Sequence, residues 1–447
     1  MQSNQGRSQW GSRLGFILAS AGSAVGLGAI WKFPYMAGAN GGSAFILPYI
    51  VLTVFIGFIV LLIEMAIGRE GKSCPSKALS AVGGKRWHVW GVVSIFTGFL
   101  ILAFYQVIGG WCLNYLIDAV SGKGLISDTT KLDHYFGGFV SDGAMSVGMQ
   151  LGFLGLTAGV LMFGVQKGIE RISKILMPLL FLMMLFLIVR GLSLDGAMDG
   201  VRFMFEFNPE AFTASSLLNA LGFSFFSLSL GSGSMMNYGS YLGEKVNLPR
   251  SVAWISFLAV MAALLGGLMI MPAVFAFGLT PGAGPGLTFV TMPVVFANLP
   301  FGQLFAIVFY LCLVVAALTS AISIMEMCVQ SFVDEFRSSR RTALMVVTLS
   351  LIVLGVPCAL SFGVLSDWTI AGKTFFDVLD YLTSNIGMPI GAMAIAIVGG
   401  YIAWPHMLKQ LSMTEAMPGW QVSTIRFCIR ILVPIVIVVI AAAGLLG

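Results

Sequence analysis

The chain has 447 residues, of which 58% are hydrophobic and 10% are charged, and its mean hydropathy is +0.95. Soluble globular proteins contain about a quarter charged residues, so this composition excludes an ordinary soluble enzyme and indicates a multi-span membrane protein. The net charge of +5 comes from Lys and Arg residues spread over short loops, so no nucleic-acid partner is expected. The six cysteines show no CxxC or His-rich pattern and predict neither a disulfide framework nor a metal site.

Eleven segments are long and apolar enough to cross a bilayer core, which requires about 20 residues per helix. The first is expected to begin at residue 13, after a polar segment, 1–12, that lacks the organisation of a signal peptide. In chain order the segments lie near 13–39, 42–69, 88–120, 143–164, 168–191, 213–243, 247–278, 300–335, 342–363, 374–403 and 422–446.

The basic residues predict the orientation of these spans. If the N-terminus is cytoplasmic, 18 of the 24 Lys and Arg residues fall on the cytoplasmic side. Cytoplasmic loops of membrane proteins carry such an excess of positive charge. We therefore expect a cytoplasmic N-terminus and, because eleven is odd, a C-terminus on the opposite side.

Two spans contain residues that disfavour a continuous helix. The first reads GSAVGLG from Gly22 to Gly28, and the sixth reads SLSLGSGS from Ser227 to Ser234. Glycine costs about 1 kcal/mol per helical position relative to alanine, and unwound backbone at membrane depth is tolerated only where it lines a cavity or is buried in protein. Paired breaks five helices apart predict an inverted repeat with a substrate and ion site at the breaks. Alternatively, the small residues only permit close helix packing.

Charged residues inside the expected spans are few and costly. Glu64, in the second span, could accept hydrogen bonds from the broken sixth helix, or it could lie near water at the inner end of its own helix. Glu326, in the eighth span, is less informative: it could simply face a wet cytoplasmic cavity, and it is given no role.

Other polar residues lie near the ends of the expected helices. Lys32 and Asp380, near the outer ends of the first and tenth spans, could pair across an entrance or be solvated independently. A Lys–carboxylate ion pair lacks the two parallel hydrogen bonds that Arg can form with a carboxylate. Such a pair should open readily, which suits a gate. On the inner side, Arg7, Trp10 and Asp334 allow a corresponding closure.

The eighth span contains two adjacent hydroxyl residues, Thr319 and Ser320, in the stretch VVAALTSAIS. Such side chains usually bond to the preceding carbonyls of their own helix. Carbonyls freed between Gly22 and Val25 could join these hydroxyls in a neutral oxygen cage of the kind that suits a sodium ion.

Several motifs resemble the neurotransmitter:sodium symporter family. They are WGSRLGFILASAGSAVGLGAIWKFPY, NGGSAFILPY, SLSLGSGSMMNYGSYL and AALTS, and the resemblance runs in order from Trp10 to about Asp380. With eleven spans the chain resembles the bacterial members. The resemblance implies an all-α leucine-transporter-type fold in the bacterial inner membrane, with helices 1 and 6 unwound at the midplane. It also implies inverted repeats over 13–191 and 213–403, followed by helix 11 over 422–446.

The resemblance also implies sodium-driven uptake of amino acids or related amines. It assigns the second sodium site of the family to three carbonyls and two hydroxyls. These belong to Gly22, Val25, Ala316, Thr319 and Ser320.

The first sodium site of the family is largely missing from this sequence. Its amide side chain after GLG is replaced by Ala29, the seventh span offers no Asn around Leu258 and Ala259, and of its side-chain ligands only Ser227 remains. An alternative is a repositioned first site that uses Ser23 and Ser227.

The chloride site is missing as well. Ala262 or Ala263 stands where the family has an acid or a serine, and Phe223 replaces a glutamine. A carboxylate or chloride without a cation beside it would be an unpaired buried charge. We therefore predict one sodium ion per cycle, no chloride and no organic cofactor.

For the substrate, the resemblance assigns the carboxylate to Tyr105 and the amides of Leu27 and Gly28. Gly26 stands where amine-specific members carry an aspartate, which favours an amino acid over a monoamine. The amine would meet carbonyls of Ala24, Phe226 and Ser227, and the side-chain walls would be Ser23, Ile101, Phe226, Ser229, Ser232 and Ile324. These walls carry no charge, so a neutral amino acid of medium or large size is expected.

The family's gates are carried over in the same way. The extracellular gate would comprise Lys32, Asp380, Tyr105 and Phe226, and the cytoplasmic gate Arg7, Trp10, Tyr241 and Asp334. Two other functions remain open: a sodium-independent amino acid exchanger and a non-transporting amino acid receptor of the same fold. The identity of the amino acid and the oligomeric state are not predicted.

Overall fold

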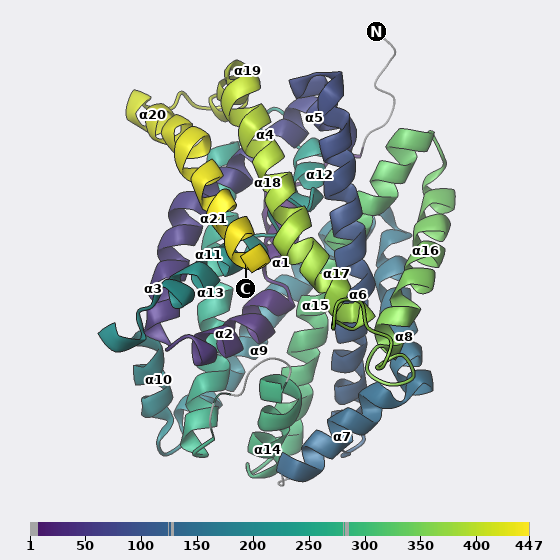
Figure 1. Ribbon diagram of the computed structural model, residues 1–447, viewed down its shortest axis with the longest axis vertical. Coiled ribbons are helices and arrows are strands. Elements are labelled where there is room, and N and C mark those ends of the chain that lie inside the picture. The colour runs from purple at the N-terminus through teal and green to yellow at the C-terminus, as the bar shows by residue number, and fades with distance from the viewer. Residues whose placement is uncertain (1–7, 124, 127–128, 280, 282–285, 447) are drawn as a thin grey trace.

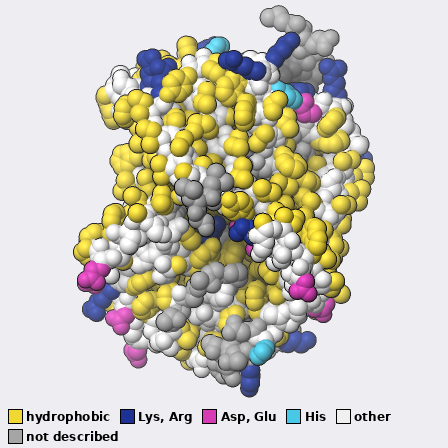
Figure 2. Space-filling view, viewed as in Figure 1, with side chains coloured by type: hydrophobic (Ala, Val, Ile, Leu, Met, Phe, Trp, Pro, Cys, Tyr) yellow, Lys and Arg dark blue, Asp and Glu magenta, His cyan; other side chains and the backbone are white. Residues whose placement is uncertain are grey.

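The computed structural model describes residues 8–123, 125, 126, 129–279, 281 and 286–446, and Figure 1 shows that they form a bundle of helices. The only β pairing in this part of the chain is a single bridge between Ile370 and Lys373. Figure 2 shows hydrophobic side chains over the middle of one face and charged side chains mainly toward its two ends. This distribution matches a chain that crosses a membrane along its long dimension.

Nine helical stretches of the described chain are long and apolar enough to cross a bilayer. They coincide with the second to fifth and the seventh to eleventh predicted spans, so the sequence located them correctly. Their bounds are Ser43–Gly71, Lys85–Val120, Gly143–Leu161, Val165–Leu192, Leu248–Ala276, Gly302–Phe336, Arg340–Leu360, Phe375–Ile402 and Gly419–Ala443.

Within these stretches the helices carry the labels of Figure 1. Short π-helical turns join α3 to α4, precede α9, and separate α17 from α18 and α20 from α21. The bounds are α3 (Ser43–Leu52), α4 (Phe58–Gly71), α6 (His88–Val120), α8 (Gly143–Leu161), α9 (Arg171–Leu192), α13 (Leu248–Ala276), α15 (Gly302–Phe336), α16 (Arg340–Leu360), α17 (Phe375–Tyr381), α18 (Met388–Ile397), α20 (Gly419–Phe427) and α21 (Val433–Leu446).

The first predicted span is broken. Helix α1 (Arg13–Ala24) ends inside the GSAVGLG motif, and the chain resumes at Gly28 in a π-helical turn that leads into α2 (Phe33–Ala39). The two parts are bent by 47°. If this pair is counted as one span, ten helical spans are present in the described residues.

The sixth predicted span is broken in the same way. Helix α11 (Ala214–Ser227) and helix α12 (Ser234–Ser240) are separated by residues 228–233, which are not helical. The backbone has positive φ at Ser229 (54°), Gly231 (76°) and Gly233 (81°). Positive φ suits glycine but is uncommon for serine, and such conformations tend to occur at functional sites.

Five shorter helices were not predicted from hydropathy. In Figure 1, α5 and α19 lie at one end of the molecule, and α7, α10 and α14 lie at the opposite end. They are α5 (Pro75–Gly83), α7 (Thr129–Ser141), α10 (Ala197–Phe205), α14 (Met292–Ala297) and α19 (Trp404–Leu411).

The broken helices lie in the interior, between continuous ones. Helix α1 packs against α13 and α15, α12 packs against α4, and α6 packs along α15. The contact between α4 and α12 is so close that a Cβ atom on Gly68 would lie 1.9 Å from the carbonyl oxygen of Met236. Glycine is therefore required at this crossing, which holds the second half of the broken sixth span against an unbroken helix.

Candidate functional site

The first break meets the eighth predicted span at Thr319 and Ser320. Ser320 Oγ donates a hydrogen bond to the carbonyl oxygen of Ser23 at 2.7 Å and lies 3.3 Å from that of Gly22. Thr319 Oγ1 instead donates within its own helix, to Ala316 at 3.0 Å. The usual back-bonding of helical hydroxyls thus describes Thr319, whereas Ser320 links α15 to the broken helix.

Four of the five residues assigned to the sodium site come together in this region. A Cβ atom on Gly22 would lie 3.1 Å from Cβ of Thr319, so the two backbones approach closely. Val25, the fifth residue, is fully buried at the C-terminal cap of α1. The donor set consists of neutral carbonyl and hydroxyl oxygens, which suits a hard cation of low charge.

A cavity of about 40 Å³ lies beside these oxygens. Eleven of the twelve predicted substrate residues line it, and Ser320 and Met388 complete the wall. The eleven are Ser23, Ala24, Gly26, Gly28, Ile101, Tyr105, Phe226, Ser227, Ser229, Ser232 and Ile324. Met388 was missed because methionine in an apolar helix carries no signal that separates a cavity wall from ordinary packing.

Leu27, the twelfth residue, contributes through its backbone. Its amide donates a hydrogen bond to the hydroxyl oxygen of Tyr105 at 3.1 Å. A Cβ atom on Gly26 would lie 2.1 Å from Ser320 Oγ and 2.9 Å from the Tyr105 hydroxyl. No side chain fits at position 26 without displacing these two hydroxyl groups, and the break therefore exposes backbone to the cavity.

The two broken helices are also joined to each other and to α4. Ser229 Oγ donates to the carbonyl oxygen of Ser23 at 3.3 Å. Glu64, which the sequence relates to the broken sixth helix, is fully buried and accepts a hydrogen bond from the Gly231 amide at 3.1 Å. The Glu64 carboxylate thus pairs with a backbone amide of the non-helical segment 228–233, which has no helical hydrogen bond.

A second cavity, the outer cavity, has a volume of about 260 Å³ and lies between the second half of the first span, α11 and α21. Phe226 and Met388 line both this cavity and the smaller one, so they separate the two. Lys32 also lines the outer cavity, and its Nζ lies 4.3 Å from the centroid of the Phe226 ring.

The suggested pairing of Lys32 with Asp380 is not seen in the described chain. Asp380 accepts a hydrogen bond from Ser384 at 3.0 Å, and no ion pair joins it to Lys32. The ammonium group lies over an aromatic face instead, an arrangement stabilised by cation–π attraction.

Trp10 links the segment before α1 to the C-terminal end of α12. Its indole Nε1 donates to the carbonyl oxygen of Tyr238 at 3.1 Å, and its backbone amide donates to that of Tyr241 at 3.3 Å. Asp334 accepts from the amide of Cys74 at 2.7 Å. Arg7, the remaining predicted member of the cytoplasmic gate, lies outside the described residues.

The expectation that Glu326 faces a wet cavity is wrong. Its side chain is fully buried and forms an ion pair with Arg340, whose two terminal nitrogens lie 2.5 and 2.9 Å from the carboxylate oxygens. The Tyr241 hydroxyl donates to the same carboxylate at 2.8 Å. The sequence did not show this pairing because Arg340 belongs to the next helix, and only the turn at 337–339 brings it back over α15.

Glu170 is a second polar residue that the sequence did not single out. It accepts hydrogen bonds from the Gly11 amide at 2.7 Å and the Ser12 hydroxyl at 2.8 Å, and it pairs with Lys174. Ser12 in turn caps α1 by accepting from the Gly15 amide. The start of the broken first span is thus fixed to α9.

Phe223, which replaces a glutamine of the family's chloride site, lies in a cluster of aromatic side chains. The rings of Phe33, Phe45, Tyr49 and Phe223 lie with centroids 5.1 to 6.3 Å apart. The Tyr49 hydroxyl lies 3.4 Å from Ser227 Oγ. A packed aromatic cluster with one hydroxyl pair stabilises by apolar burial and offers few oxygen ligands.

Known proteins share both the sequence and the fold of this chain. The model of the sodium:neurotransmitter symporter family matches residues 7–129 and 127–446. An uncharacterized sodium-dependent transporter of Bacillus subtilis is 43% identical over 390 residues, which cover 87% of this chain and 86% of the relative. Another from Haemophilus influenzae is 34% identical and covers 92% of this chain and 93% of its own length.

A solved structure agrees with these relatives. The crystal structure of MhsT in complex with L-phenylalanine matches with a TM-score of 0.91 and 38% identity, over 98% of this chain and 100% of that one. The matched proteins are transporters rather than enzymes, and the curated relatives are named sodium-dependent. By sequence, fold and the broken helices that carry its site, the chain belongs to the sodium:neurotransmitter symporter family.

Proposed function

We propose that this transporter imports a neutral amino acid together with one sodium ion per cycle and does not require chloride. The observation that carries the proposal is the uncharged cavity that shares Ser320 with the predicted sodium site. Because one hydroxyl belongs to both sites, occupation of one would reposition the other. Such sharing supports thermodynamic coupling between ion and substrate.

The geometry around the first break suits an amino acid. The carboxylate would bind the Tyr105 hydroxyl and the amides of Leu27 and Gly28, and the ammonium group would bind carbonyl oxygens of Ala24 and Phe226. No charged side chain lines the cavity, which supports a substrate whose own side chain is neutral. The complex of MhsT with L-phenylalanine supports the same class.

A single sodium ion is supported by the packing at the missing first site. The alternative, a repositioned site using Ser23 and Ser227, would need both hydroxyls. Ser23 Oγ lies 2.6 Å from Ser323 Oγ, and Ser227 Oγ donates to the carbonyl oxygen of Ser224 at 3.2 Å. The two hydroxyls thus bond to different helices, α15 and α11, and no hydrogen bond among the described residues joins them into one oxygen cluster.

We further propose that residues 13–191 and 213–403 form the two inverted repeats, and that the protein lies in the bacterial inner membrane with its N-terminus in the cytoplasm. The outer gate would comprise Lys32, Asp380, Tyr105 and Phe226, and the inner gate Arg7, Trp10, Tyr241 and Asp334. Alternating access would open one gate at a time around the shared cavity.

Thermal stability of the purified protein tests the proposal. A panel of amino acids is added in sodium and in an equal concentration of choline, because any ligand of the folded state stabilises it by RT ln(1 + [L]/Kd). We expect one or a few neutral amino acids to stabilise the protein only in sodium. Uptake into proteoliposomes then follows with the same ligands.

The loss of first-site ligands makes a sodium-independent exchanger the second candidate. Equal stabilisation in choline, with exchange of internal for external amino acid, would establish it. Sodium-dependent binding with neither uptake nor exchange would instead indicate a receptor.

A further inference from the structure

A groove on the outside of the bundle is distinct from the transport site. It has a volume of about 480 Å³ and lies between α6, α15 and α16. Its walls are largely apolar, with Phe96 and Phe99 on one side and Phe332 and Phe336 on another. Phe96 and Phe336 are 59% and 69% exposed, so the groove opens toward the surroundings of the bundle.

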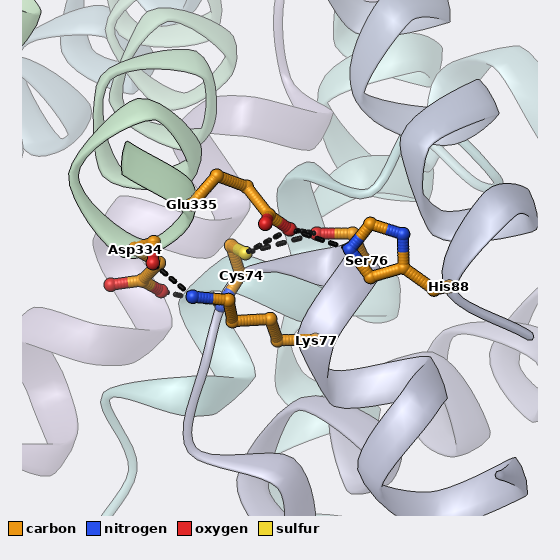
Figure 3. Close-up of polar contacts among 6 residues, drawn as sticks. All are labelled: Cys74, Ser76, Lys77, His88, Asp334 and Glu335. Atoms are coloured by element: carbon orange, nitrogen blue, oxygen red, sulfur yellow. Dashed lines mark hydrogen bonds and ion pairs between the residues drawn. The ribbon is translucent and has the colours of Figure 1, made fainter. Parts of the chain in front are cut away.

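One end of the groove is polar. His88, at the start of α6, and Glu335, near the end of α15, line it together, with His88 Nε2 2.9 Å from Glu335 Oε1. Figure 3 shows that Cys74 and Ser76, at the start of α5, also approach Glu335. Burial raises the pKa of the Cys74 thiol, which therefore stays protonated as a weak donor.

These contacts all reach the same carboxylate oxygen. Ser76, Cys74 and His88 approach Glu335 Oε1, and no described residue donates a hydrogen bond to Oε2. The Glu335 side chain is 24% exposed. The groove therefore presents one carboxylate oxygen that can accept a hydrogen bond from a cationic donor.

A buried hydroxyl lies one helical turn deeper. Ser331 lines the groove, is 4% exposed, and its Oγ has no hydrogen-bond partner among the described residues. An unpartnered buried hydroxyl costs free energy, so such groups are normally satisfied by a ligand or by water. Four residues of helix place Ser331 about 6 Å below Glu335 along the axis of α15.

The length of the groove matches one leaflet of a bilayer. On α6 it extends from His88 to Phe99, eleven residues or about 16 Å, and half of a bilayer core is about 15 Å. Exposed basic residues flank its polar end, Lys85 and Arg86 before α6 and Arg337 and Arg341 after α15. The positive-inside rule assigns this end to the cytoplasmic interface.

We propose that this groove binds a phospholipid with a primary-amine head group, phosphatidylethanolamine, from the inner leaflet. Its ammonium group donates to Glu335 Oε2, its phosphate lies among the flanking basic residues, an ester carbonyl accepts from Ser331, and one acyl chain occupies the aromatic part of the groove. Along α15, Glu335 and Ser331 follow the order of ammonium and ester along the lipid, and the deeper apolar lining of the groove comes mainly from α6 and α16.

The test compares three lipids with identical dioleoyl chains. Phosphatidylethanolamine, phosphatidylcholine and phosphatidylglycerol are titrated in turn into the delipidated protein in detergent. Retained lipid is counted by native mass spectrometry, and the melting temperature is measured in parallel. We expect phosphatidylethanolamine to bind at least about tenfold more tightly than phosphatidylcholine, which has no N–H donor, because a charge-assisted hydrogen bond is lost.

Two variants assign the head group to its predicted partners. Glu335→Gln should remove the preference for phosphatidylethanolamine. Ser331→Ala should weaken the binding of all three lipids to the same extent. Ser256→Ala is the matched control, since this hydroxyl is also buried and unpartnered but lies outside the groove. If Glu335→Gln does not fold, Ser350→Phe, at an exposed position in the groove, should block the acyl chain and abolish retention.

Equal retention of all three lipids by the unaltered protein would overturn the proposal, and so would a preference for phosphatidylglycerol. Retention unchanged by Ser350→Phe would show that the lipid binds elsewhere. None of these readouts depends on transport, so they remain informative whatever the substrate proves to be.

Discussion

Thr319 and Ser320 are neighbours with different partners, and this difference predicts unequal effects of substitution. Ser320 connects α15 to the first break and also lines the cavity, whereas Thr319 bonds within its own helix. Sodium coupling and substrate binding should therefore both be sensitive to position 320. Substitution at position 319 should chiefly weaken sodium binding.

Ser320→Ala should raise the sodium concentration for half-maximal uptake by about tenfold or more, because one oxygen ligand of the ion is lost, and it should also weaken amino acid binding. Thr319→Ala should raise the sodium requirement with a smaller change in amino acid affinity measured at saturating sodium. Sodium titrations of uptake and of thermal stability measure both quantities. Thr348→Ala, which removes a back-bonded hydroxyl from α16, is the control. An unchanged sodium requirement in both site variants would refute the assignment.

Gly26 is a position at which no side chain fits beside the hydroxyls of Ser320 and Tyr105. Gly26→Ala would place a methyl group against Ser320 Oγ and the Tyr105 hydroxyl, so amino acid affinity should fall at least about tenfold while the protein still folds. Gly155→Ala, where nothing lies within 4 Å, should have no effect. Amino acid binding by both variants, measured by thermal shift, checks the difference, and retained affinity in the Gly26 variant would show that the substrate lies elsewhere.

Among the helices, α12, α15 and α16 are joined through one buried carboxylate. Glu326 is held by Tyr241, the residue that follows α12, and by Arg340 from α16. The broken sixth span is therefore linked at its inner half to two continuous helices. Movement of α12 during transport would have to stretch or break the hydrogen bond from Tyr241.

Arg340→Met should destabilise the protein by about 3 kcal/mol, since it leaves Glu326 charged and unpaired in the interior. The double variant with Glu326→Met should recover much of this loss, because it removes the remaining charge. Chemical denaturation in detergent measures both effects. Arg341→Met, at the exposed neighbouring position, provides the comparison, and a double variant as unstable as the single one would contradict the explanation.

The sequence predicted the long helices well because about 20 consecutive apolar residues leave few alternatives to a span. It did not predict α5 or α14, which are too short to appear as spans and depend on contacts with the rest of the fold. It identified Glu64 from its cost inside a span but assigned no partner to Glu326. Glu170 was not singled out, because its partners lie in the N-terminal segment 158 and 159 residues away.

The backbone part of the candidate site could be predicted from the sequence, because a glycine-rich stretch inside a span indicates that the helix is interrupted there. The side chains that line the cavity could be predicted only through the resemblance to the family's motifs. The cavity wall at Met388 and the position of Lys32 over Phe226 depend on how α18 and α11 pack, which no local pattern encodes.

For the molecule as a whole, the number of coupled ions limits accumulation. One charge moving through about 100 mV yields about 2.3 kcal/mol, and a tenfold sodium gradient adds about 1.4 kcal/mol. If one sodium ion is coupled per cycle, as proposed above, these values together allow a neutral amino acid to be concentrated about 500-fold. A second sodium ion would square this limit.

Proteoliposomes with imposed sodium and voltage gradients should therefore reach an accumulation ratio no greater than about 500 under these conditions, and replacing chloride by gluconate should leave uptake unchanged. Isotope uptake to steady state, together with the ratio of sodium to amino acid flux, measures the stoichiometry. Accumulation well above this limit would require a second coupled ion, and a chloride requirement would refute the assignment of the aromatic cluster.

Phe226 and Met388 line both the small cavity and the larger outer cavity, so their side chains form a partition between the two. A ligand that fits entirely within the small cavity would let the two side chains close over it. A longer ligand with the same amino acid head would pass between the two side chains and hold them apart. The change from transported substrate to competitive inhibitor would then depend on ligand length rather than on affinity, and a homologous series of amino acids should show a sharp cut-off in uptake but none in binding.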